Sequence, residues 1–154
     1  MFEILLRHWP HIKEGEEKDA SLREATFNSK LKWRLLYKKA ECTGTEMIGE
    51  RKSYKVVLTP SAGKPFEQYY DVESGLLVRS VVTVNSSAGS VLSENSYSDY
   101  KEAGGVQFPH KLTHRIGMEE TVVVLDSVRC NVDIAWYRFD LPPEVKALLA
   151  KSRR

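Results

Sequence analysis

The sequence has no long hydrophobic run. No stretch approaches the roughly 18 apolar residues that a membrane-spanning helix needs, so no transmembrane segment is predicted. The opening residues 1–7 also lack a basic leader and a small-residue cleavage site, so no export signal is expected.

Neither sign of charge is in excess. Lys and Arg together number 23 and Asp and Glu 21, with the two signs mixed along the chain. Such a surface offers no broad positive field to hold phosphates, so nucleic acid is not an expected partner. The basic tail, residues 151–154, is the local exception, and a solvated terminus accounts for it.

Cysteine is scarce, and the motifs of nucleophilic and phosphate-binding sites are missing. Cys42 and Cys130 match no metal or redox spacing and are expected to be two half-buried thiols. A disulfide between them would require the first and last strands to meet. There is no Gly-x-Ser-x-Gly motif, and the glycines in residues 103–106 join two predicted strands rather than open a helix. The sequence therefore predicts no enzyme, no cofactor and no metal site.

What the sequence does have is the composition of one folded domain. It contains 154 residues, of which 42% are hydrophobic and 29% charged. The prediction is a single α+β domain over residues 1–154. It comprises a helical segment over 1–39, a long curled antiparallel sheet over 40–136, and a C-terminal arm and short helix over 137–154.

Two helices are predicted before the sheet. Phe2, Leu5, Leu6 and Trp9 have the spacing of one apolar stripe, which predicts a short helix that ends before Pro10. A charged connection over 13–19 follows.

The second helix is predicted to begin at residue 21, because residues 21–24, SLRE, have the form of a capping box. Phe27, Leu31 and Leu35 continue its apolar face at four-residue steps. This helix is expected to end near Lys39.

From about residue 40 the apolar period changes to two, which predicts a meander of antiparallel strands. Turn-forming residues interrupt the pattern about every ten positions, and connections this short cannot make parallel crossovers. Strands of this length must twist and coil, so the expected shape is an incomplete barrel. The seven predicted strands are 40–48, 53–59, 66–71, 76–84, 91–101, 106–116 and 121–131.

The C-terminal residues predict an arm and then a helix. Pro143 suits the first helical position, and Glu144 lies near the positive end of the helix dipole. This helix is expected to dock on the sheet and close one end of the core.

Each of three predicted strands carries several apolar residues two or four positions apart, which therefore share one face of the strand. A curled sheet must cover such a face with helices, with another sheet or with a ligand, and both a plain core and a ligand pocket stay open. The candidate ligand-binding residues on these faces are Tyr54, Val56, Leu58, Leu76, Val78, Val82, Phe108, His110, Leu112, His114 and Ile116.

Two of these candidates are histidines four positions apart. On a helix His110 and His114 could share one metal ion, but their segment alternates as a strand. Each is either a hydrogen-bonded, half-buried histidine or a polar group that lines a pocket. His8 and His11 have no third ligand in view, and a surface position accounts for them.

Several segments together resemble one known superfamily. They are 54–60 (YKVVLTP), 68–79 (QYYDVESGLLVR), 97–101 (YSDYK), 105–109 (GVQFP) and 138–142 (RFDLP). They resemble segments of the bacterial outer-membrane lipoprotein-sorting proteins, the LolA/LolB-like superfamily. The likeness covers about residues 40–149 of this chain, which resemble the C-terminal part of those proteins. The resemblance implies an incomplete antiparallel barrel with a helical lid, whose inner face takes lipid acyl chains, in the periplasm or elsewhere in the cell envelope.

Two functions follow as hypotheses. In the first, the chain is a non-catalytic envelope module that binds a lipid or lipoprotein acyl chain on the apolar concave face of a half-barrel. In the alternative, it is a structural or protein-interaction domain of a larger envelope protein, without a small-molecule ligand. An exposed edge strand could then pair with a protein partner.

Overall fold

The computed structural model describes residues 13–27, 31–86 and 89–152. Its main feature is an open antiparallel sheet of seven strands, and the predicted helix over residues 2–9 lies outside the described residues. The helices are α1 (Gly15–Ala25), α2 (Trp33–Leu36), a short 3-10 helix η1 (Trp136–Phe139) and α3 (Pro143–Ser152). The strands are β1 (Tyr37–Ile48), β2 (Arg51–Pro60), β3 (Phe66–Asp71), β4 (Leu77–Ser86), β5 (Gly89–Ala103), β6 (Val106–Ile116) and β7 (Glu119–Val124).

The strands follow one another through the sheet in chain order, and every neighbouring pair is antiparallel. This confirms the predicted seven-stranded meander. The order has a simple cause, because connections of a few residues can only return the chain to the adjacent position in the sheet.

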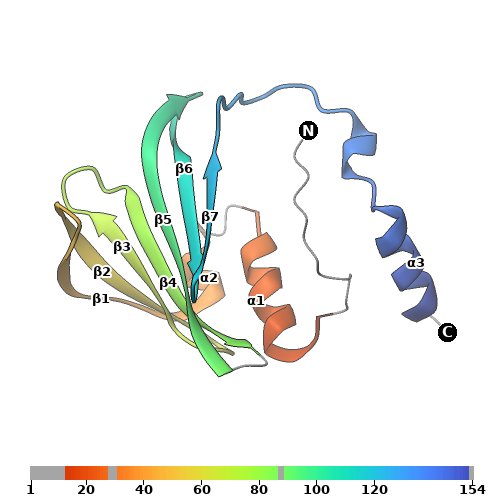
Figure 1. The fold of residues 1–154 in the computed structure, drawn as a ribbon, viewed down its shortest axis with the longest axis horizontal. Coiled ribbons are helices and arrows are strands. Elements are labelled where there is room, and N and C mark those ends of the chain that lie inside the picture. The colour runs from red at the N-terminus through yellow and green to blue at the C-terminus, as the bar shows by residue number, and fades with distance from the viewer. Residues whose placement is uncertain (1–12, 28–30, 87–88, 153–154) are drawn as a thin grey trace.

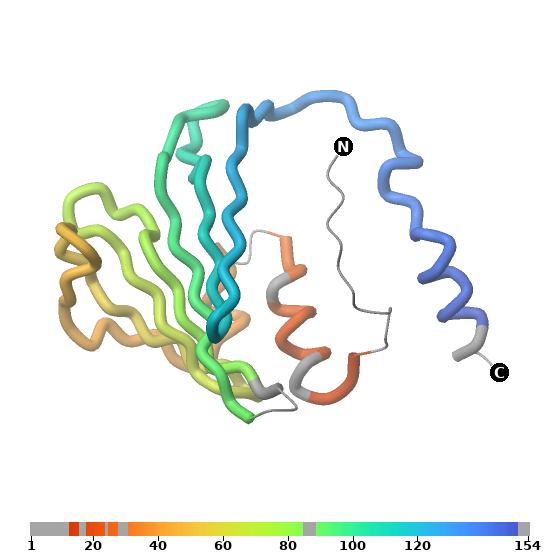
Figure 2. Tube along the Cα trace, viewed as in Figure 1, coloured from red at the N-terminus to blue at the C-terminus, as the bar shows by residue number. Residues whose placement is uncertain are grey.

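The sheet is strongly curved, and α1 and α2 lie on its concave side (Figure 1). The Cα trace shows the same curvature, with the C-terminal segment passing over one end of the sheet toward α3 (Figure 2). Curvature is expected of strands this long, since twist accumulates along each of them. The concave side is therefore where this fold can enclose a ligand or a core.

Cross-strand partners identify the residues of the concave face, because side chains directly opposite in a ladder point to the same side of a sheet. Starting from the first strand, Cys42 pairs with Val56, which pairs with Gln68. The same row then continues through Ser80, Asn95, His114 and Thr121.

The first part of the chain differs from the prediction. Helix α1 begins at Gly15 and ends at Ala25, so Ser21 lies inside it and the capping box at 21–24 was wrong. The charged run over 13–19 consists largely of good helix formers, and most of it is helical rather than a connection. The predicted continuation to Lys39 was also wrong, since α1 ends at Ala25, α2 covers Trp33–Leu36 and β1 starts at Tyr37.

The apolar face predicted for that second helix is not buried. The exposed fractions of Phe27, Leu31 and Leu35 are 81%, 82% and 83%. Regular four-residue spacing had suggested a packed stripe, but α1 ends before these residues.

The last predicted strand and the C-terminal helix also need correction. Strand β7 ends at Val124, because the chain bends at Asp126, a residue type that favours turns, and residues 125–131 are not a strand. Helix α3 forms at Pro143 as predicted, but it lies apart from the sheet, beyond α1, and does not close the core (Figure 1).

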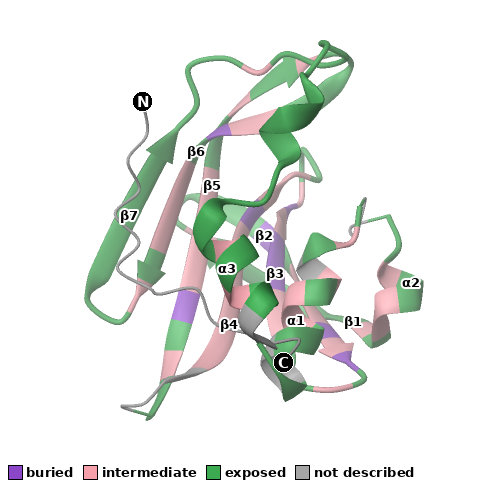
Figure 3. Ribbon diagram, turned by 90° about the vertical axis from the view of Figure 1, so that its right-hand side faces the viewer, coloured by how far each residue is buried: buried purple, intermediate pink, exposed green. Residues whose placement is uncertain are grey.

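The fully buried apolar core is small. Among the described residues only Leu58, Tyr69 and Val78 are buried hydrophobic side chains. Figure 3 shows β7 exposed along its length, and most residues over 125–150 are exposed as well. Many large hydrophobic side chains of the described residues are exposed instead, among them Phe27, Leu31, Met47 and Trp136.

Within the described ranges, the structure contains no helix with the length and apolar character needed to cross a membrane.

Candidate ligand-binding site

The concave face contains a hollow at its β1–β3 end, which we call the apolar cavity. Its volume is about 330 Å³, within the range of roughly 300–1,000 Å³ that small-molecule sites occupy. Most of its lining is apolar or aromatic, and Trp33 at the start of α2 contributes to one side. The lining residues are Trp33, Tyr37, Ala40, Cys42, Val56, Leu58, Gln68 and Tyr70.

A second hollow of about 320 Å³ lies beside the first and is partly covered by α1. We call it the mixed cavity, because polar and apolar groups alternate around it. Tyr37 and Gln68 line both cavities, so the two are neighbours on one continuous floor. The lining residues are Ala20, Arg23, Tyr37, Lys64, Phe66, Gln68, Ser80, Val81, Val82, Asn95 and Tyr97.

Polar side chains on the floor bond to one another. The Tyr70 hydroxyl donates a hydrogen bond to Gln68 Oε1 over 2.7 Å, and the Ser80 and Tyr97 hydroxyls lie 3.3 Å apart. Gln68 is among the most buried side chains of the described residues. A buried amide that accepts from a half-buried hydroxyl avoids the cost of an unpaired polar group.

Burial shapes the protonation of the tyrosines near the floor. Burial raises the pKa of Tyr70, and the neighbouring Tyr97 and Tyr37 act in the same direction. Burial also raises the pKa of Tyr100 to about 12, and its hydroxyl donates to the Leu77 carbonyl over 2.5 Å. These tyrosines are neutral hydrogen-bond donors near neutral pH.

The two histidines on β6 have partners of their own. His110 is buried, with Nδ1 3.1 Å from the Phe108 carbonyl oxygen, and His114 Nδ1 lies 2.9 Å from Asn95 Oδ1. No group of three or more His, Cys, Asp or Glu side chains suited to a metal ion occurs in the part of the chain that the structure describes. The contacts favour hydrogen-bonded histidines over pocket-lining ones.

A third hollow, of about 660 Å³, lies near the turns that follow β1 and β3. Its lining mixes carboxylates with cations, and Asp71 serves the turn itself by accepting the Glu73 backbone N–H over 2.9 Å. That hydrogen bond is the main reason that the pKa of Asp71 is lowered, despite the opposing effect of burial. The arrangement is that of a stabilised turn rather than a ligand pocket.

The convex face, in contrast, carries paired charges. Lys55 Nζ lies 2.8 Å from Glu67 and 3.3 Å from Glu46, and Arg79 lies 2.6 Å from Glu94. The hydrogen bond with Glu67 raises the pKa of Lys55 above its ordinary value. Burial opposes ionisation of Glu67, but its bonds with Lys55 and Tyr69 hold its pKa below the usual range. This face suits contact with water, which leaves the concave face as the candidate site.

The predicted site residues divide into three groups. Val56 and Leu58 line the apolar cavity and Val82 lines the mixed cavity. Tyr54 shares the concave side of the sheet but lies outside both hollows, and so do the five β6 candidates, Phe108, His110, Leu112, His114 and Ile116. Val78 is buried at an irregularity in the β3–β4 ladder and also lies outside both hollows. Leu76 precedes β4 and lines the third hollow instead, so its predicted place on a strand face was wrong.

Sequence reasoning missed several lining residues. Cys42 and Gln68 face Val56 across the two neighbouring strands, so the strand register would have revealed them. Arg23 lies on α1, and the sequence around it does not indicate where this helix packs on the sheet. Cys42 and Cys130 are both free and exposed, which corrects the expectation of half-buried thiols.

Comparison of the chain with protein-family models, with curated proteins and with solved structures finds no match.

Proposed function

We propose that this chain is a non-catalytic module of the bacterial cell envelope that binds a lipid or lipoprotein acyl chain on the concave face of a half-barrel. The observation that carries the proposal is the apolar cavity, a hollow of about 330 Å³ between α2 and strands β1–β3. Burying a methylene group in such a site is worth about 0.8 kcal/mol, so an acyl chain gains affinity with each carbon that enters.

The incomplete burial of the fold supports the same proposal. Large exposed apolar patches are unusual on soluble monomers and mark surfaces that bind something. Here the fully buried apolar side chains are few in the described residues, while the concave face keeps two open hollows. The resemblance of residues 40–149 to lipoprotein-sorting proteins supports the acyl ligand and the envelope location.

The two free cysteines offer a direct test. Cys42 lines the apolar cavity, whereas Cys130 lies beside Gly104 at the end of the β5–β6 hairpin. An acyl ligand should slow alkylation of Cys42 and leave Cys130 unchanged, as measured by mass spectrometry of the labelled peptides. Native mass spectrometry of the same sample, before and after incubation with lipid extract, should show a matching increase in mass.

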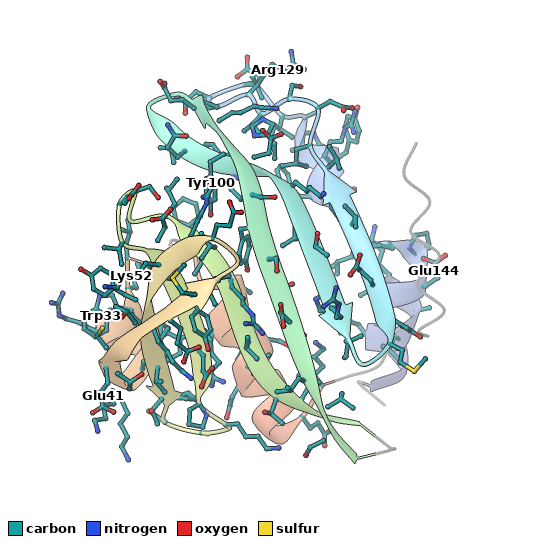
Figure 4. The ribbon with its side chains drawn as sticks, turned by 60° about the vertical axis from the view of Figure 1, so that its left-hand side comes forward. Trp33, Glu41, Lys52, Tyr100, Arg129 and Glu144 are labelled. Atoms are coloured by element: carbon teal, nitrogen blue, oxygen red, sulfur yellow. The ribbon has the colours of Figure 1, made fainter. Side chains whose placement is uncertain are left out.

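A variant pair locates the binding. Ala40→Phe fills the apolar cavity and should abolish both the added mass and the protection of Cys42. Glu41→Phe adds an aromatic ring at the next residue of β1, which points to the opposite side of the sheet, and should leave both intact. Figure 4 shows Glu41 and Trp33 at this β1 side of the molecule. An apo mass and equal cysteine reactivity in every lipid mixture would overturn the proposal.

The second candidate function is a protein-interaction domain that recruits a partner strand. It is favoured by β7, an edge strand whose Val122, Val123 and Val124 are all exposed. An uncovered apolar edge can accept an additional strand from another chain.

A further inference from the structure

We propose that the ligand of the concave face is an acyl ester or amide, whose carbonyl oxygen accepts a hydrogen bond from the Gln68 amide nitrogen while its tail lies in the apolar cavity. This inference rests on the proposed function and names the chemical group by which the same site would recognise an acyl chain. Gln68 lines both cavities, so a carbonyl held there lies at the border between them.

The hydrogen bonds of Gln68 carry the inference. Its side chain is 2% exposed, and its Oε1 accepts the Tyr70 hydroxyl over 2.7 Å. Its amide nitrogen, which can donate twice, has no hydrogen-bond partner among the described residues. Most buried side-chain polar atoms in native proteins are paired, so a donor left over on a cavity wall favours an acceptor that comes from outside the chain.

The nitrogen of Gln68 reaches the open space of the site. In the part of the chain that the structure describes, Arg79 Nε is the one fully enclosed side-chain nitrogen or oxygen without a partner. The Gln68 nitrogen is therefore not sealed within the sheet, although its side chain is almost inaccessible. Since this residue lines both hollows, its donors meet the space that a ligand would fill.

The character of the concave face changes at Gln68. In its cross-strand row, Cys42 and Val56 precede it on β1 and β2 and line the apolar cavity. Ser80 and Asn95 follow it on β4 and β5 and line the mixed cavity. A tail on the apolar side therefore brings its first polar atoms to Gln68. The group linked to the carbonyl then continues into the mixed cavity, which suits an ester or amide better than a free acid.

A tail that fills the apolar cavity makes the carbonyl necessary. Such a tail excludes water from the Gln68 nitrogen, and a buried donor without an acceptor costs free energy. The carbonyl of an ester or amide supplies an acceptor at the first carbon of the tail, whereas an alkyl ether has a methylene group there. The hydrogen bond thus fixes how far the tail enters the cavity as well as how tightly it binds.

The experiment compares three uncharged probes with the same twelve-carbon tail, each below its micelle-forming concentration. They are monododecanoylglycerol, its amide analogue and the dodecyl ether of glycerol. The readout is the probe concentration that half-protects Cys42 from alkylation, with Cys130 as the internal reference. The ester and the amide should protect at concentrations about tenfold lower than the ether. The ratio between ester and amide shows which linkage the site prefers.

A variant pair assigns the preference to its residue. Both variants are made in a Tyr70→Phe background, so that no hydroxyl loses its acceptor. Gln68→Leu should remove the preference for ester over ether. Gln107→Leu is the matched control, because it removes the same amide from an exposed position of β6 and should leave the preference intact. Circular dichroism confirms that each variant is folded.

Infrared spectroscopy of the bound ester gives a second readout, which a change in packing alone would not move. The carbonyl band of an ester lies outside the amide bands of the protein. A hydrogen bond from Gln68 should shift this band to lower wavenumber in the wild-type complex, and the shift should be absent with Gln68→Leu. An unshifted band in the wild-type complex would overturn the hydrogen bond.

The outcomes separate this inference from the function on which it rests. Equal protection by ester, amide and ether would overturn recognition of the carbonyl while acyl binding stands. A preference for the ester that persists with Gln68→Leu would overturn the assignment to Gln68. Absence of protection by all three probes would overturn the proposed function itself.

Discussion

The Tyr70 hydroxyl donates a 2.7 Å hydrogen bond to Gln68 Oε1 on the floor of the concave face. The two residues lie on the same side of β3. Gln68 lines both cavities, so this hydrogen bond fixes the side chain that lies between the two cavities. It also explains how a nearly inaccessible amide can line the apolar cavity.

Replacing Gln68 with Leu is expected to lower the free energy of unfolding by about 1–3 kcal/mol, because the half-buried Tyr70 hydroxyl loses its acceptor. In a Tyr70→Phe background the same replacement should cost less, since no hydroxyl is left unsatisfied. Urea unfolding of the wild type, both single variants and the double variant measures this coupling. Equal costs in the two backgrounds would mean that the hydrogen bond contributes nothing.

Truncating Leu58 tests how much the small apolar core contributes to the free energy of unfolding. It is 5% exposed on β2, and Leu58→Ala removes three buried carbon atoms, so unfolding should become easier by about 2–5 kcal/mol. Leu92→Ala is the control, because Leu92 is 62% exposed on β5 and its truncation should cost less than about 0.5 kcal/mol. The comparison uses urea unfolding of delipidated protein. Similar losses for both variants would contradict the burial assigned to Leu58.

Much of the sheet was predictable because its determinants are local. Alternating apolar residues and turn formers identify each strand, and the strands predicted over 66–71 and 106–116 have the observed bounds. The helix boundaries were harder to predict from the sequence. Residues 21–24 fit a capping box, but the preceding charged residues favour helix equally well, and the helix starts six residues earlier, at Gly15.

The candidate site was predictable only in part, for a physical reason. Alternation identifies which residues share a face, and this was enough for Val56, Leu58 and Val82. The strand register decides which residues of the neighbouring strands lie opposite these three. The curvature of the sheet and the positions of the helices decide which part of the face becomes a hollow. These are long-range properties, so Gln68 was missed and His114, on the same face, was expected in the site.

The convex charge pairs predict an acid dependence of stability. The pKa of Glu67 is lowered in the folded protein, and so is that of Asp71, so each carboxylate stabilises the fold above its unfolded pKa. This contribution is lost as the pH falls from about 4.5 through the folded values. Glu67→Gln should flatten the fall in the free energy of unfolding below pH 5, whereas Glu119→Gln, at an exposed position of β7, should not. An unchanged profile in Glu67→Gln would contradict the pairing with Lys55.

Tyr100 predicts a loss of stability at alkaline pH. Its folded pKa is raised from 10.0 to about 12, chiefly by burial, so the folded state retains a proton that the unfolded chain releases. The resulting stability is complete below pH 10 and is lost as the pH rises through 12. Tyrosinate absorbance should show a late-titrating tyrosine that disappears in Tyr100→Phe. In the control Tyr137→Phe, which removes a tyrosine that is 60% exposed, the late step should remain.

The two edges of the sheet differ in how they resist pairing with another chain. Strand β1 carries charged residues along its length, and its ladder with β2 has two irregularities, both of which discourage strand addition. Strand β7 ends in three consecutive valines, and its ladder with β6 is regular. The Leu125 N–H donates to the His110 carbonyl over 2.8 Å, so the alternation of an antiparallel ladder directs the backbone groups of Val122 and Val124 outward.

We therefore expect the protein to self-associate or to add a partner strand through β7, and Val122→Lys should weaken this because a lysine on an edge opposes pairing. Sedimentation velocity over a range of protein concentrations measures the change. Leu92→Lys is the matched control, since it places the same charge at an exposed leucine of an interior strand that has no free edge. If both variants reduce association equally, exposed apolar surface in general is responsible. A wild-type protein that stays monomeric and gains no partner strand would leave ligand binding as the role of this fold.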